Sequence, residues 1–127
     1  MQSLTPILMV DSIEPCLGLW EKLGFKVTVS VPEGDALGFV ILNNGAVEVM
    51  YQTRASVAKD VPAMADFPSS SILYIHVTNL DEVIAAIGDA PVLVPKRTTF
   101  YGATEYGVRE PGGNAVSFSE TSSAHAG

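Results

Sequence analysis

The sequence has few of the residues that hold metals or form disulfides. Cys16 is the one cysteine among 127 residues, and His76 and His125 are the two histidines. One cysteine excludes a disulfide scaffold and a structural zinc knuckle, because each of these needs several thiols. His125 falls in a stretch of small and polar residues, so we expect only His76 to be available for chemistry. Three-histidine metal sites and two-histidine, one-carboxylate iron sites are therefore excluded.

Basic residues and long apolar runs are also scarce. Seven Lys and Arg stand against fourteen Asp and Glu, which gives a formal net charge of −7. Without a basic surface a protein cannot release counterions from a phosphate backbone, so we expect no nucleic-acid partner. No stretch approaches the roughly 20 apolar residues of a membrane span, and the first residues lack a positively charged leader. We therefore expect no membrane association and a cytoplasmic location, where a single thiol stays reduced.

The length and the 47% hydrophobic content fit a single domain over residues 1–127. Alternating apolar residues and turn residues predict two similar modules within it, about 3–52 and 72–120. A connector at 53–71 joins them, with at most one short helix near 56–59, and a polar tail follows at 121–127.

Both modules have the predicted order βαβββ. In the first, Ser12 is the expected N-cap of a helix that carries Cys16 and Trp20 on its apolar face. In the second, Asn79 is the expected N-cap. The predicted strands are 3–10, 25–31, 37–42 and 46–52 in the first module and 72–77, 91–95, 103–110 and 114–120 in the second, with helices at 13–23 and 80–87.

The two modules also match each other in sequence. Residues 10–14 overlay residues 77–81 at an offset of 67, and residues 44–48 overlay residues 113–117 at an offset of 69. Order, spacing and element type agree along both halves, which indicates an internal repeat.

Two short motifs carry a family resemblance. Leu19-Trp-Glu-Lys-Leu-Gly-Phe25 ends the first helix, and Glu110-Pro-Gly-Gly-Asn114 forms the turn before the last strand. Over residues 4–120 the chain resembles the vicinal oxygen chelate superfamily of glyoxalases, bleomycin-resistance proteins and ring-cleaving dioxygenases. The segments 6–10 and 101–106 are most similar to the bleomycin-resistance branch. The resemblance implies an α+β fold in which two βαβββ modules form a curved mixed sheet around a cup.

The resemblance also implies where a catalytic metal would be held. The four ligand positions of the metal enzymes fall on Thr5, Glu48, Ile72 and Ser117. Isoleucine offers no lone pair, and hydroxyls are poor ligands, so one carboxylate in four cannot hold a divalent ion. We therefore expect no metal, no cofactor and no metal-dependent lyase or dioxygenase chemistry.

Strand alternation extends these four positions to a predicted ligand-binding face. Glu48 is either functional there or a relic that reaches water or pairs with Arg54 or Arg97. The methionines and Tyr106 have core or sheet packing as their competing interpretation, and no residue is assigned a catalytic role. The predicted ligand-binding residues are Thr5, Met9, Glu48, Met50, Ile72, Tyr74, His76, Phe100, Tyr101, Tyr106 and Ser117.

These observations favour a metal-independent protein that binds a small organic ligand, neutral or cationic and partly aromatic, such as an antibiotic. The resemblance to the bleomycin-resistance branch implies a homodimer in which the first strand crosses to the partner about Pro6, and two-fold symmetry is also the commonest form of oligomer. One alternative is an enzyme of the same superfamily, either with an unorthodox metal site including Glu48 or metal-free with acid-base chemistry by Glu48 and His76. A protein-interaction module with a closed cup is the third interpretation.

Overall fold

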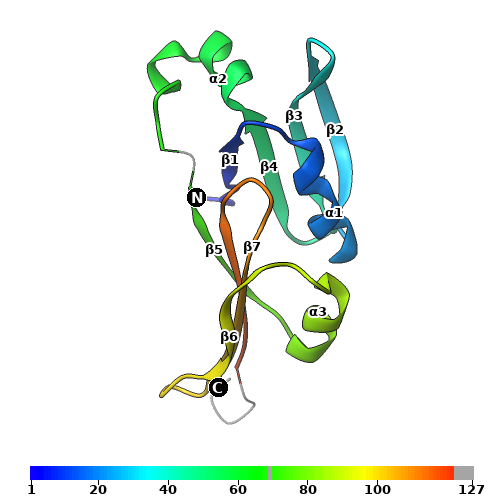
Figure 1. Ribbon diagram of the computed structural model, residues 1–127, viewed down its shortest axis with the longest axis vertical. Helices are drawn as coiled ribbons and strands as arrows, with labels where there is room; N and C mark the ends of the chain where they lie inside the picture. Colours follow the sequence, from blue (N-terminus) through cyan, green and yellow to red (C-terminus); the bar gives the residue numbers. More distant parts are fainter. Residues whose placement is uncertain (69, 122–127) are drawn as a thin grey trace. The chain divides into compact units, whose positions relative to one another are not determined.

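The structure is a computed structural model that describes residues 1–68 and 70–121 (Figure 1). The chain divides into two compact units, unit 1 over residues 1–70 and unit 2 from residue 71 onward. The predicted tail at 121–127, with His125, lies outside the described residues except for Thr121. No helix in the described part of the chain is long and apolar enough to cross a membrane.

Unit 1 contains a four-stranded mixed sheet in the order β1-β4-β3-β2. β1 pairs in parallel with β4, and the other neighbours are antiparallel. Strand β1 is shorter than the predicted 3–10, because Pro6 cannot donate an amide hydrogen to the ladder and contributes only its carbonyl, which accepts from the Met50 amide. The elements are β1 (Ile7–Val10), α1 (Glu14–Lys22), β2 (Lys26–Glu33), β3 (Ala36–Asn43) and β4 (Glu48–Thr53).

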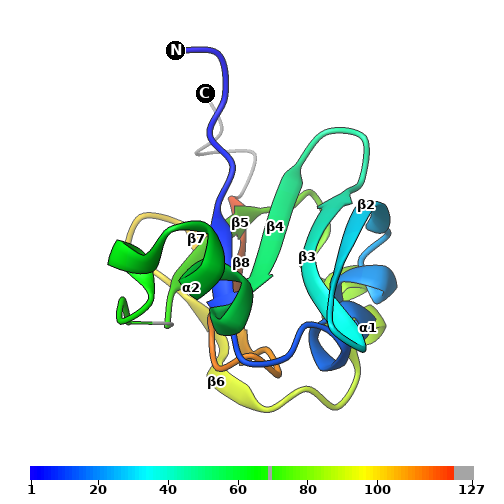
Figure 2. The same cartoon turned by 90° about the horizontal axis from the view of Figure 1, so that it is seen from above.

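One face of this sheet forms the core of unit 1. Alternate residues of β1, β3 and β4 are buried, and the fully buried residues of α1 include Cys16 and Trp20. Trp20 Nε1 donates to Tyr51 Oη at 2.9 Å, so the indole N–H is satisfied inside the core. In Figure 2, α1 lies beside β3, and it contacts that strand. The other face of the sheet is therefore left for other contacts.

The predicted N-cap of α1 is wrong. Ile13 occupies the cap position, and no side chain accepts a hydrogen bond there. The Ser12 carbonyl instead accepts from the Cys16 thiol. Pro15 in the first turn needs no partner for a backbone hydrogen, so the helix begins without a polar cap.

The connector contains more helix than the sequence predicts. Helix α2 spans Arg54–Asp60 and a 3-10 turn, η1, spans Pro62–Met64. Thr53 caps α2, because its Oγ1 accepts from the Ser56 amide at 3.1 Å. Helix α2 contacts β1, β3 and β4, so it bounds part of the sheet that α1 leaves open (Figure 2).

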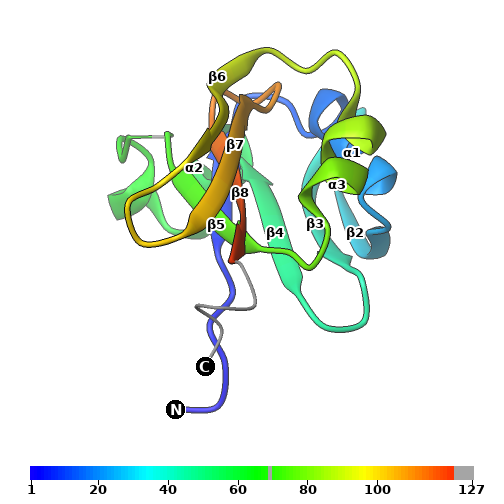
Figure 3. The ribbon, with the colours of Figure 1, turned by 90° about the horizontal axis from the view of Figure 1, so that it is seen from below.

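Unit 2 repeats the same topology with the sheet order β5-β8-β7-β6 (Figure 3). The predicted cap of α3 is confirmed, because Asn79 Oδ1 accepts from the Glu82 amide at 3.2 Å. Helix α3 contacts β7 and β8, and its residues Leu80 and Ile87 are buried. The elements are β5 (Ile72–His76), α3 (Leu80–Ile87), β6 (Val92–Thr98), β7 (Ala103–Arg109) and β8 (Ala115–Thr121).

Strand pairing measures the internal repeat directly. Ile7 pairs with Met50 in unit 1, and Tyr74 pairs with Ser117 in unit 2, so each residue of the second pair lies 67 positions after its counterpart. The offset of 69 that the sequence suggests for the last strand is therefore wrong. The counterpart of Glu48 is Ala115, and that of Ser117 is Met50.

The order of the elements is the predicted one in both units. Each unit is a βαβββ module with a four-stranded mixed sheet, which confirms the α+β fold class.

Candidate functional site

Unit 1 has an open groove on the sheet face opposite α1. Its volume is about 570 Å³, within the range of small-molecule sites. Ile7, Val31, Phe39 and Met50 supply an apolar floor from four different strands. The remaining lining residues are polar, namely Glu33, Gln52, Ser56, Lys59 and Asp60.

A charged pair stands at the side of the groove that α2 forms. Lys59 Nζ lies 2.5 Å from Glu33 Oε1, and the two side chains are 75% and 26% exposed. Exposed pairs of this kind contribute little to stability, so these charges are free to respond to a ligand. Asp60 adds a further carboxylate on the same side.

Glu48 lies on the same sheet face as Met50, at the start of β4. Its carboxylate is half-buried and accepts from Thr5 Oγ1 and Asn43 Nδ2, each at 3.4 Å. Of the alternatives left open for Glu48, pairing with Arg54 is not seen, because Arg54 donates to the Ala65 and Phe67 carbonyls. Within unit 1 the structure therefore brings together two predicted ligand-binding residues, Thr5 and Glu48.

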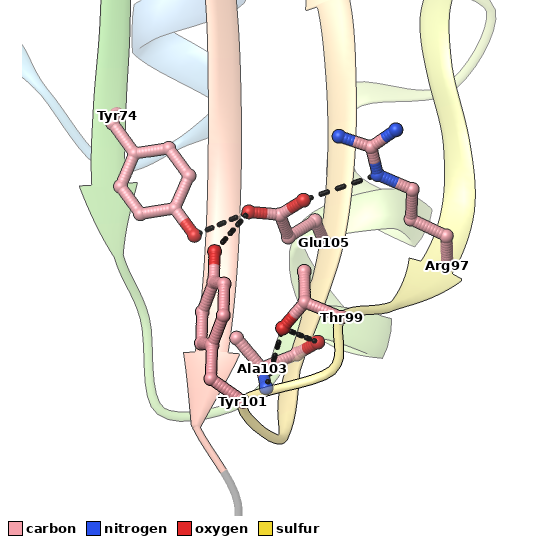
Figure 4. A network of polar contacts seen from close by, with 6 residues as sticks. All are labelled: Tyr74, Arg97, Thr99, Tyr101, Ala103 and Glu105. Carbon is pink, nitrogen blue, oxygen red and sulfur yellow. Dashed lines mark hydrogen bonds and ion pairs between the residues drawn. The ribbon is translucent and has the colours of Figure 1, made fainter.

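Unit 2 has a polar cluster on one face of its sheet, formed by Tyr74, Arg97, Tyr101 and Glu105 (Figure 4). Tyr74 Oη and Tyr101 Oη both donate to Glu105 Oε2, at 2.5 and 3.2 Å, and Arg97 Nε donates to Oε1 at 3.1 Å. Tyr74 and Glu105 come from strands on either side of β8 and meet across it. We call these four residues the tyrosine cluster.

The three donors hold the Glu105 carboxylate in its ionised form. The hydrogen bond from Tyr74 is the largest cause that lowers the pKa of Glu105, and Arg97 and Tyr101 add to it against the effect of burial. The same bond to Glu105 raises the pKa of Tyr74 to about 12. At neutral pH Glu105 is therefore a carboxylate and Tyr74 a neutral phenol.

The loop between β6 and β7 fixes the position of Tyr101. Thr99 Oγ1 accepts from the Ala103 amide at 3.1 Å, and the Thr99 amide donates to the Ala103 carbonyl at 2.7 Å (Figure 4). Gly102 has φ of +87°, which a side chain would disfavour. Tyr101 therefore reaches Glu105 from the turn between β6 and β7, not from a strand.

The other predicted residues lie as follows. The His76 and Tyr74 rings meet edge to face at 5.3 Å, and the Phe100 and Tyr101 rings do so at 5.1 Å. Phe100 is fully exposed. In the sheet of unit 2, Ile72 and Ser117 lie on the same face as Tyr74, the face opposite α3. In unit 1, Met9 lies on the same face as Ile7.

Tyr106 lies apart from these residues. It follows Glu105 in β7 and pairs with the buried Phe118, so it points to the opposite face of the sheet. Tyr106 is thus placed by sheet packing, which was its competing interpretation.

Most residues of these two sites are absent from the predicted ligand-binding residues. Of the groove only Met50 was predicted, and of the tyrosine cluster only Tyr74 and Tyr101. Phe39 and Glu105 each lie on the third strand of their module. A usable signal was Glu105 itself, a carboxylate inside a predicted strand and flanked by the uncharged Thr104 and Tyr106.

The residues present do not fit the divalent ion that the resemblance implies for the metal enzymes. Thr5 uses its hydroxyl hydrogen on Glu48, and Ile72 has no donor atom. Among residues 1–68 and 70–121, no three His, Cys, Asp or Glu side chains gather closely enough to hold a metal ion.

Known proteins match this chain by structure. No protein-family model matches the sequence, and no curated protein matches it significantly. A glyoxalase/bleomycin resistance protein/dioxygenase from Nocardioides is similar to it with a TM-score of 0.71 and 15% identity, over 97% of this chain and 85% of that chain.

Two further solved structures are similar to it. A lactoylglutathione lyase from Agrobacterium tumefaciens has a TM-score of 0.73 and 14% identity, over 94% of each chain. A bleomycin-binding protein complexed with bleomycin has a TM-score of 0.62 and 16% identity, over 96% of this chain and 100% of that chain. The chain therefore has the glyoxalase/bleomycin resistance/dioxygenase fold, that of the vicinal oxygen chelate superfamily which its motifs resemble.

Proposed function

We propose that the chain binds a small organic ligand, neutral or cationic and partly aromatic, without a metal ion. The groove of unit 1 carries this proposal. Its volume of about 570 Å³ would hold a compound of drug size, and Ile7, Val31, Phe39 and Met50 offer apolar contact. An open groove with a polar side is typical of reversible binding, in which the ligand keeps part of its surface in water.

The charges around the groove favour a ligand that carries no negative charge. Glu33 and Asp60 line it against the single Lys59, and Glu48 lies on the same sheet face. The whole chain has a formal charge of −7, which raises the local concentration of cations. Sequestration of a compound such as an antibiotic is the biological role that we infer from this chemistry.

The structural neighbours support the proposal at the level of the fold. One of them is a bleomycin-binding protein complexed with bleomycin, so this fold can hold a bulky organic ligand. Because the donor set of this chain does not fit a divalent ion, binding is the better-supported function.

We further propose a homodimer and a cytoplasmic location. Two-fold symmetry is the commonest way for small domains to associate, and a sequence with a single cysteine suits a reducing compartment. Strand exchange about Pro6 would replace the pairing of β1 with β4 of its own chain. Sedimentation equilibrium at micromolar concentration tests the dimer, and a monomer there would contradict it.

A matched pair of variants tests the groove as the ligand site. We expect the neutral probe 2-phenylethanol to shift the backbone amide signals of Ile7, Phe39 and Met50 in NMR titration. Met50→Gln should raise its dissociation constant about fivefold, since each lost apolar group costs about 0.8 kcal/mol. Met9→Gln is the control, because Met9 is half-buried on the same face but does not line the groove. Equal affinity in both variants, or shifts elsewhere only, would contradict the proposal.

A further inference from the structure

The tyrosine cluster of unit 2 has an unusual division of donors and acceptors. Both oxygens of Glu105 are used: Oε2 by two phenolic hydroxyls and Oε1 by Arg97. Each tyrosine has thus spent its one hydroxyl hydrogen on the carboxylate. Each phenolic oxygen can therefore only accept a further hydrogen bond. At Tyr74 the Ser119 hydroxyl is one such donor and lowers the pKa of the phenol, which leaves a second lone pair for a ligand.

Exposure makes these acceptors available. The side chain of Glu105 is only 8% exposed, whereas Tyr74 and Tyr101 are 44% and 48% exposed. On the tyrosine side, solvent therefore meets two phenol groups rather than the carboxylate itself, and the Arg97 side chain, 64% exposed, meets solvent on the other side. Their aromatic faces carry negative electrostatic potential, and an ionised acceptor on each hydroxyl hydrogen makes its oxygen more electron-rich.

The positive group of the cluster faces elsewhere. Arg97 neutralises Glu105 through Nε, and Figure 4 shows its two terminal nitrogens on the far side of Glu105 from the tyrosine hydroxyls. The two hydroxyls meet at one carboxylate oxygen, so their oxygens lie near each other. A donor with two or more N–H groups could reach both.

We propose that Tyr74 and Tyr101, oriented by Glu105, form a binding site for a protonated amine. The ammonium group donates to the two phenolic oxygens, and its attached carbons lie against the half-exposed rings, as cations do on aromatic faces. A carboxylate is rejected, because the cluster offers it no hydrogen on the tyrosine side. The site rests on the proposed small-molecule function and adds to it a binding site within unit 2 for a compound that bears an amine.

Glu105 acts in this site as a positioning residue. It fixes the rotation of both hydroxyls and thereby turns their lone pairs away from itself. The loop bonds of Thr99 with Ala103 hold Tyr101 in place from the other end. The site is therefore assembled from β5, β7 and the turn before β7.

Three probes with one phenyl group test the site: 2-phenylethylamine as the cation, 2-phenylethanol as the neutral control and phenylacetate as the anion. Backbone amide shifts at pH 7 report where each binds. We expect the amine to shift the amides of Tyr74, Tyr101 and Glu105, and the other two probes to leave them unchanged. Tyr74→Phe and Tyr101→Phe keep the rings but remove the acceptors, so each should weaken amine binding about tenfold.

Tyr106→Phe is the matched control, because it deletes the same oxygen on the opposite face of β7. It should bind the amine as the wild type does. Absence of amine binding, equal shifts with the alcohol, or wild-type affinity in both Tyr74→Phe and Tyr101→Phe would overturn the proposal. The proposed function is judged separately, by the alcohol-dependent shifts of Ile7, Phe39 and Met50 in unit 1.

Discussion

The two units place different chemistry at equivalent positions of the same ladder. In unit 1 Val31 pairs with Phe39, and in unit 2 Arg97 pairs with Glu105. Phe39 pairs in turn with Gln52, and Glu105 pairs with Ser119. Gln52 and Ser119 are 67 positions apart, the offset between the two modules at this strand. The face that is an apolar groove in unit 1 is thus a polar cluster in unit 2. The equivalent pairs are Ile7 and Tyr74, Val31 and Arg97, Phe39 and Glu105, and Met50 and Ser117.

The difference shows that packing against the helix limits the residue types on one face of each sheet, whereas the other face differs between the units. On the helix side the buried residues correspond in kind, such as Ile13 with Leu80 and Trp20 with Ile87. On the other side a carboxylate replaces a phenylalanine, and three donors accompany it. A poorly solvated charge needs such partners, since an unpaired one would be costly. The helix side therefore serves stability, and the other side tolerates different side-chain chemistry in the two units.

The largest expected loss of stability comes from the helix side of the sheet, where both units have a buried apolar core. Ile13→Ala and Leu80→Ala should each lower the free energy of unfolding by about 2–5 kcal/mol, because each truncates a buried side chain and leaves a cavity. Chemical denaturation measures both, with Glu21→Ala on the exposed side of α1 as the control. A loss below 1 kcal/mol in either variant would show that this side of the unit is not its core.

Two glutamate variants compare the other faces. Glu105→Gln should cost about 1–2 kcal/mol, because a carboxylate with three hydrogen bonds is replaced by an amide that cannot accept them all. Glu48→Gln should cost less, since its two hydrogen bonds are long at 3.4 Å. The same denaturation experiment measures both, and the reverse order would contradict the assigned roles.

The helix starts differ between the units as well. Asn79→Ala removes the cap of α3 and should cost about 1 kcal/mol, whereas Ser12→Ala should cost almost nothing, because Ser12 caps no amide. Thermal unfolding distinguishes the two variants. Equal losses would mean that Ser12 caps α1 in solution.

The smallest expected effect is a pH dependence. The pKa of Tyr74, about 12, exceeds its ordinary value of 10, so this residue contributes stability that is complete below pH 10 and is lost as the pH rises through 12. Ultraviolet titration should show a late ionisation in the wild type that is lost in Tyr74→Phe. Glu105 has the opposite sign, because its lowered pKa gives stability that is lost as the pH falls through it. An ordinary Tyr74 titration would disprove the hydrogen bond to Glu105.

Much of the fold could be predicted from sequence, because local signals were sufficient. The alternation of apolar and polar residues located the strands, and Asn79, a residue type that favours the N-cap position, indicated the start of α3. The cap of α1 could not be predicted, since Pro15 and Ile13 begin that helix without a polar contact. Thr53 was a usable cap signal, and its helix was longer than expected.

The candidate sites were predicted less well, because they depend on strand register. The loop match at 44–48 and 113–117 suggested that Ser117 corresponds to Glu48, but the turn of unit 2 is one residue longer. Tyr74 and Tyr101 were predicted individually. Tyr101 lies four residues from Glu105, but Tyr74 lies 31 residues from it on another strand, and no local pattern reveals that second contact.

The most direct test of the account moves the chemistry of unit 2 into unit 1. Val31→Arg with Phe39→Glu creates in the groove the pair that Arg97 and Glu105 form in unit 2. If the apolar floor of unit 1 binds the ligand, 2-phenylethanol should lose its amide shifts at Ile7 and Met50 in the double variant. Circular dichroism should show the fold unchanged, because both positions lie off the core face. Binding of 2-phenylethanol with unchanged affinity in the folded double variant would contradict the account.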